Sequence, residues 1–146
     1  MAVFPSVRPR LSRLQFAYER VRRQARTAGL YIELVLDPDA YDPPRHYAFV
    51  LDHEVTDEGG TIHVASELNI LRPEQVLGIL YHELGHVIDL AGLGAEFKRV
   101  YSADEEIRAD ELIRDCFDVE IFYDPDTMIQ SIQWRPGFIS RPPGLK

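Results

Sequence analysis

The segment His82-Glu83-Leu84-Gly85-His86 lies within a run of apolar residues and constrains this chain more than any other feature. Pro73 and Glu74 are typical of the first turn of a helix, which predicts a helix that opens at residues 71–74 and runs to about Leu90. On a helix the two imidazoles lie on one face, about one turn apart. Burying them beside a carboxylate is costly unless a metal ion or several polar groups satisfy them. The fold must therefore bring such a partner to this face.

A zinc ion is the partner that this spacing favours. Two histidine nitrogens at this spacing can both reach one ion, at about 2.0–2.1 Å from each. Glu83 lies about 100° round the helix from His82, so it is placed to accept a proton from water and not to bind the ion. We therefore predict His82 and His86 as Zn²⁺ ligands and Glu83 as the general base.

The third ligand is expected from an acidic helix that follows the motif. Catalytic zinc sites usually have three protein ligands and one open position. The remaining histidines, His46, His53 and His63, all precede the motif, which disfavours a third histidine. Ser102 and Glu105 have capping-box spacing, which predicts a helix over residues 103–117. Its carboxylates are the natural source of the ligand.

Glu106, Ala109 and Asp110 share one face of this predicted helix. Glu106 is the preferred ligand, and Ala109 leaves room for the two helices to approach closely. Asp110 is placed to accept the other ring N–H of a ligating histidine and so to fix its tautomer. Glu111 and Asp115 repeat the spacing one turn later, with an arginine in place of the small residue. They are the alternative pair.

The segments before the motif predict an α+β fold. An apolar stripe from Leu11 predicts an N-terminal helix that Gly29 ends. β-branched and aromatic residues predict a strand at residues 31–36, and further strands at 47–51 and 61–65 are expected to form a hairpin with a long acidic loop. We therefore expect an N-terminal helix, a small twisted sheet and two helices that carry the site.

A single domain over residues 1–123 and a proline-rich tail over residues 124–146 are expected from length and composition. A short strand is predicted near residues 119–123, and no long helix is expected further on. Deletion of residues 125–146 is accordingly expected to spare the fold and the zinc site.

The motif and the acidic helix together resemble a minimal gluzincin, a zinc metallopeptidase of the HExxH (zincin) class, and are closest in plan to the ImmA/IrrE family. The resemblance covers roughly residues 30–117 and rests on the strand at 61–65, the motif helix and Glu106-x-x-Ala109-Asp110. It implies that Glu106 is the third zinc ligand, that Glu83 activates water and that the strand borders the substrate cleft. Members of this family cut protein substrates, often regulators, and many occur in phages. The long acidic loop and the proline-rich C-terminus depart from the family's plan.

The expected function is hydrolysis of a peptide bond in a protein substrate. The exposed edge of the strand at residues 61–65 would align the peptide by strand addition. His63 and Tyr101 are the candidates for stabilising the oxyanion. The alternative is a structural or assembly component, for example of a phage virion, that keeps the zinc-binding fold while proteolysis is incidental or lost.

Charge and composition limit the partners. The net charge is −8, which disfavours nucleic acid, and we find neither a signal peptide nor an apolar run long enough to span a membrane. A cytoplasmic location is expected, or the virion if the chain is phage-encoded. The one cysteine, Cys116, is expected to be a buried and unreactive thiol.

The two ends are the candidate contacts to a larger protein assembly. Residues 1–29 hold seven arginines against one acidic residue, and the tail carries Trp134 and Phe138. The alternative is that the first helix packs on the sheet through its apolar stripe while its arginines are solvated or paired. The arginines are Arg8, Arg10, Arg13, Arg20, Arg22, Arg23 and Arg26.

Overall fold

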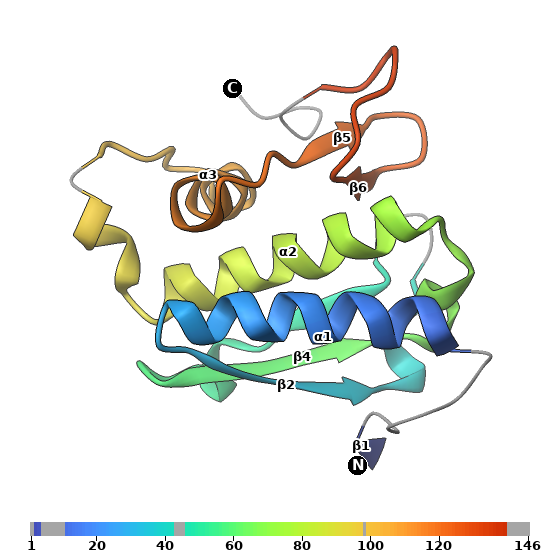
Figure 1. The fold of residues 1–146 in the computed structure, drawn as a ribbon, viewed down its shortest axis with the longest axis horizontal. Helices are drawn as coiled ribbons and strands as arrows, with labels where there is room; N and C mark the ends of the chain where they lie inside the picture. Colours follow the sequence, from blue (N-terminus) through green and yellow to red (C-terminus); the bar gives the residue numbers. More distant parts are fainter. Residues whose placement is uncertain (1, 4–10, 43–45, 98, 140–146) are drawn as a thin grey trace.

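The computed structural model of this chain describes residues 2–3, 11–42, 46–97 and 99–139. In these residues the fold is α+β, with three α-helices and a small mixed sheet (Figure 1). The helices are α1 (Ser12–Thr27), α2 (Pro73–Leu90) and α3 (Glu105–Phe117). The strands are β1 (Ala2–Val3), β2 (Tyr31–Leu36), β3 (Ala48–Val50), β4 (Gly59–Val64), β5 (Phe122–Asp124) and β6 (Ile129–Ser131).

The main sheet has the strand order β1-β2-β4-β3. β4 pairs in parallel with β2 and antiparallel with β3, so the predicted hairpin of residues 47–51 and 61–65 is confirmed. The predicted exposed edge on the strand at 61–65 is wrong, because β2 and β3 hydrogen-bond to the two sides of β4. Among the described strands, β3 forms that edge of the sheet instead.

The helices form two layers above the sheet (Figure 1). α1 and α2 lie over one face of the sheet, and α3 and the β5–β6 hairpin lie on the far side of α2. α2 is therefore enclosed on nearly all sides, and almost all of its residues from Gln75 to Ile88 are buried. This position explains the high apolar content of its sequence, because a helix without a solvent face needs no polar stripe.

The N-terminal helix packs through the predicted stripe, with Leu14, Val21 and Ala25 buried against α2 and the sheet. Several of its arginines have partners within the chain. Arg13 donates to the Leu71 carbonyl at 2.7 Å, Arg22 pairs with Glu19 at 3.2 Å, and Arg20 and Arg26 lie over the rings of Tyr81 and Tyr31. Arg8 and Arg10 lie outside the described residues. These contacts agree with the packing alternative, and a partner for this helix stays a prediction.

Regular structure continues past Asp124, where the sequence carries no clear pattern, and the short strand predicted near residues 119–123 overlaps β5. β5 and β6 pair antiparallel, and the expected domain boundary after residue 123 falls inside β5. The side chain of Asp124 accepts hydrogen bonds from the Asp126 backbone N–H and the Thr127 hydroxyl, which closes the turn between the strands. Ile129 and Ser131 are buried. We therefore expect deletion of residues 125–146 to destabilise the domain.

The hairpin reaches the motif helix at Gly78. A Cβ added at this glycine would lie 2.6 Å from the Cα and the backbone nitrogen of Ser131, and the Ile132 N–H donates to the Glu74 carbonyl at 3.1 Å. Trp134, further along the tail, is 56% exposed while Phe138 is partly buried. Docking of a partner through these two rings stays a prediction. In the described residues, no helix is long and apolar enough to cross a membrane.

Gly78→Ala is expected to lower the free energy of unfolding. Alanine favours a helix by roughly 1 kcal/mol over glycine, but the added methyl group would collide with the Ser131 backbone, and overpacking costs about 1–3 kcal/mol. Urea unfolding followed by circular dichroism measures the net effect. Arg23→Ala, at an exposed position of α1, is the control and should stay within about 0.5 kcal/mol of wild type. A stabilised Gly78→Ala variant would contradict the close packing of the hairpin.

Candidate metal centre

α2 carries both histidines on the side that faces α3. The helix begins at Pro73, as its sequence predicts, and the Gln75 side chain accepts a hydrogen bond from the Arg72 backbone N–H at 3.0 Å. His82 is 2% exposed, whereas the side chain of His86 is 17% exposed. The pair therefore extends from the interior towards a surface opening.

α3 begins at Glu105, directly before Glu106, and Asp104 caps that start. Its carboxylate accepts hydrogen bonds from the backbone N–H groups of Glu106 at 2.9 Å and Ile107 at 3.3 Å. The expected capping role of Ser102 is wrong, because its hydroxyl accepts from the Asp104 N–H and shapes the preceding turn instead. The aspartate at the cap position fixes the register of the helix.

α2 and α3 approach most closely where two small residues meet. A Cβ built on Gly85 would lie 2.3 Å from the Ala109 carbonyl oxygen, so no larger residue fits there. In Figure 1, α2 runs across the view while α3 is seen almost end-on, so the two helices cross steeply. The predicted close approach at Ala109 is confirmed.

This approach brings His82, His86 and Glu106 together. The Nε2 atoms of His82 and His86 are 3.2 Å apart, and each lies 3.1 Å from a carboxylate oxygen of Glu106. Bonds of about 2.0–2.1 Å at tetrahedral angles separate two ligand atoms by roughly 3.3 Å. The three side chains, which are the one such group found among the described residues, therefore lie close enough together to hold a metal ion.

Asp110 holds the other nitrogen of His82. Its Oδ1 atom lies 2.7 Å from His82 Nδ1, and the aspartate is 7% exposed. The predicted contact between Asp110 and a histidine of the motif is confirmed. When Nδ1–H donates to this carboxylate, the lone pair of a neutral His82 is on Nε2 and points at the cluster.

The proton affinities of the cluster follow from burial and charge. Burial alone would lower the pKa of His82, but Asp110 and Glu106 raise it well above its ordinary value. Hydrogen bonds from His82 and His86 hold the pKa of Glu106 far below its ordinary value. Burial raises the pKa of Glu83 above the usual range, against the opposing effect of the two histidines. Without an ion, His82 faces an acceptor at each nitrogen and is held as an imidazolium.

A salt bridge fixes the start of α3 against the end of α2. The Arg108 guanidinium donates twice to the Asp89 carboxylate, at 2.8 Å each, and once to the Ser102 carbonyl at 3.0 Å. Two parallel hydrogen bonds of this kind set orientation as well as distance. They hold α3 in the register that places Glu106 at the histidines.

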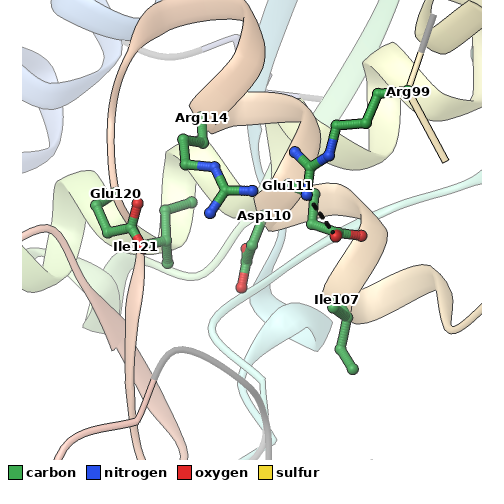
Figure 2. A pocket seen from close by; sticks show the side chains of 7 residues that line it. All are labelled: Arg99, Ile107, Asp110, Glu111, Arg114, Glu120 and Ile121. Carbon is green, nitrogen blue, oxygen red and sulfur yellow. Dashed lines mark hydrogen bonds and ion pairs between the residues drawn. The ribbon is translucent and has the colours of Figure 1, made fainter. Parts of the chain in front are cut away.

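The alternative ligand pair lies on a different side of α3. The Arg99 guanidinium donates to Glu111 at 2.9 Å and to Asp115 at 3.0 Å, and the Tyr101 hydroxyl donates to Asp115 at 2.7 Å. Figure 2 shows Glu111 beside Arg99 at a cavity of about 240 Å³, which is called the second cavity below. Both acids are therefore satisfied away from the two histidines, because a step of one residue rotates the side chain by about 100°.

Neither expected oxyanion residue lines the site. His63 is buried on β4, where its Nε2 lies 2.6 Å from Glu54 and its ring stacks on Phe49. Tyr101 donates to Asp115, and its burial and that hydrogen bond raise its pKa. Both side chains are held by other partners, and neither lines the cleft beside the cluster.

Cys116 lies outside the cluster as well. It is partly buried, where full burial was expected, and it packs against the core. Burial raises the pKa of its thiol to about 11. A thiol that stays protonated at neutral pH is a poor nucleophile, which agrees with the predicted unreactive role.

A cleft of about 190 Å³ opens beside the cluster. Its walls include Glu83, His86 and Glu106 together with residues of β3 and the start of α3. Two further residues of this cleft, His46 and Asp52, flank β3 and were not predicted to belong to the site. They do flank a predicted strand, but their closeness to the motif depends on β3 lying at the sheet edge, which no local pattern indicates.

Comparisons of this chain with protein-family models, with curated proteins and with solved structures found no match. The resemblance to the ImmA/IrrE family thus rests on the sequence pattern of residues 30–117, and it stays a prediction.

Asp110→Asn is expected to destabilise the metal-free protein by roughly 2 kcal/mol at about pH 6, because it removes a charged hydrogen bond to buried His82. The pKa of His82 is raised in the folded state, so this contribution is complete below the unfolded pKa and is lost as the pH rises through the folded one. Urea unfolding in EDTA at about pH 6 and about pH 10 should therefore show a smaller effect at the higher pH. An effect that grows with pH would contradict the imidazolium assignment.

Proposed function

We propose that this chain is a zinc-dependent metallopeptidase that hydrolyses peptide bonds in a protein substrate. The observation that carries the proposal is the tripod of His82, His86 and Glu106, of which His86 and Glu106 line one cleft together with the buried carboxylate of Glu83. Structural metal sites are usually closed by four protein ligands, whereas a tripod leaves a position open. A glutamate next to an open position favours catalysis over a purely structural role.

The three ligands would hold Zn²⁺ through His82 Nε2, His86 Nε2 and a Glu106 oxygen. Asp110 orients His82 for this task, and the Arg108–Asp89 salt bridge orients the helix that carries Glu106. Zinc, when bound, would polarise the scissile carbonyl and lower the pKa of a water molecule.

Glu83 is the proposed general base. Glu83 is 8% exposed and lines the cleft. Its side chain makes no hydrogen bond to another described residue. The raised pKa of this carboxyl increases its affinity for a proton. Glu83 would take the proton of the attacking water and deliver it to the leaving amine.

The substrate backbone is proposed to lie along β3. This strand forms the sheet edge in the described residues, and Ala48, Phe49 and Val50 line the cleft. An edge strand offers backbone N–H and C=O groups that an extended peptide can pair with. β3 thus takes the aligning role that the sequence suggested for residues 61–65.

The zinc site is tested by metal analysis. We expect about one zinc per chain after dialysis, and Glu106→Ala should strip most of it because the site then has two ligands. Glu111→Ala is the matched control, since this acid pairs with Arg99 and not with the histidines. If Glu111→Ala loses the metal and Glu106→Ala keeps it, the proposed ligand set is wrong.

The base is tested by Glu83→Gln. The amide keeps the size of the side chain but cannot accept the proton, so zinc content and melting temperature should be retained while hydrolysis falls by about 10²-fold or more. A broad peptide library with product detection by mass spectrometry measures the rate. Hydrolysis at the wild-type rate would remove Glu83 from the mechanism. Zinc binding by a wild type that cleaves no peptide would favour the structural or assembly function instead.

A further inference from the structure

The charge of the cleft remains negative after the catalytic groups are accounted for. Two of its carboxylates, Glu83 and Glu106, are assigned to the proposed reaction, and Asp89 is neutralised by Arg108. Asp52 and Glu105 also line the cleft. No lysine or arginine of the described residues does so.

Asp52 and Glu105 belong to different walls of the cleft. Asp52 follows β3 and opens a short 3₁₀ helix (Asp52–Glu54), while Glu105 is the first residue of α3. Both residues are exposed, and neither side chain has a hydrogen bond or ion pair to another described residue that would neutralise it. Arg108 also interacts with Glu105, but its guanidinium donates to Asp89 and to two backbone carbonyls. Two carboxylates are thus available to a ligand.

The same cleft also offers apolar surface. Leu90 is 43% exposed and lines the cleft with Val50. Long basic side chains lay their methylene stems on apolar surface and keep the charged head in water or near a counter-charge. A lysine or arginine side chain fits both features of this cleft.

The buried carboxylate of Glu83 is a second sign, besides the exposed acids, that the cleft receives a ligand. A side chain that is 8% exposed and faces a cavity is costly to leave charged without a partner. The acidic groups at the rim therefore surround a place where a ligand is expected, and are not only a solvated patch.

We propose that the cleft selects peptides with a lysine or arginine close to the scissile bond, through Asp52 and Glu105. This inference rests on the proposed peptidase function and specifies its substrate class. The attraction is electrostatic, so the preference should weaken as salt is added.

Peptide binding tests the inference without relying on hydrolysis. Two labelled peptide pools with the same randomised flanks carry either lysine or norleucine at the central position, so they differ in charge and hardly in stem length. Fluorescence anisotropy with zinc-loaded Glu83→Gln gives their affinities. We expect the lysine pool to bind about fivefold more tightly, which is what one or two exposed ion pairs supply. Combining Asp52→Asn and Glu105→Gln in that background should bring the ratio close to one.

Glu120→Gln is the matched control, because it removes one exposed carboxylate at the second cavity across α3. It should leave the lysine preference intact. Equal affinity for both pools, or a preference that survives the double substitution, would overturn the inference. Failure of the peptidase proposal is seen separately, as missing zinc or missing hydrolysis in the wild type. The same titrations in EDTA then show whether the cleft still prefers the lysine pool.

Discussion

The contact between Gly85 and Ala109 is the constraint on which the candidate site depends. A Cβ at Gly85 would lie 2.3 Å from the Ala109 carbonyl, so the two helices touch through backbone at this point. On either side of the contact, His82 meets Asp110 and His86 meets Glu106. A larger residue at Gly85 would push α3 outwards and would lengthen all of these contacts together. Interiors are packed too densely for such a shift to be absorbed locally.

The polar cluster also specifies how the two helices are aligned. Most of α2 is apolar and would tolerate several arrangements of α3, because hydrophobic burial has no direction. The buried imidazole of His82 changes this, since it needs Asp110 at one nitrogen and a further partner at the other. Only one register supplies both. The bidentate pair of Arg108 and Asp89 acts in the same sense at the end of the helix.

Local patterns predicted much of this arrangement, and non-local pairing accounts for most of the errors. The bounds of α2 follow from Pro73 and from the glycines after Leu90, and those of β2 follow from its β-branched and aromatic residues. Glu106 is favoured over Glu111 because Ala109 lies beside it on the helix face. The central place of β4 could not be read from its residues, since it depends on β2, which lies far away in sequence. The strand predicted near residues 119–123 overlaps β5, but β6 and its pairing were missed because a strand of three residues is too short for a clear alternation. The turn of the β5–β6 hairpin did carry a signal, the aspartate and threonine at Asp124 and Thr127.

The shortness of β3 bears on how a peptide would be recognised. β3 spans Ala48–Val50, and the 3₁₀ helix Asp52–Glu54 follows it almost at once. Such an edge resists unwanted pairing with other chains, because few backbone groups are offered. It also limits how many main-chain hydrogen bonds an extended peptide could make, and these bonds carry no sequence information. Discrimination between peptides must then come from side chains beside the strand, where the unneutralised carboxylates of Asp52 and Glu105 lie.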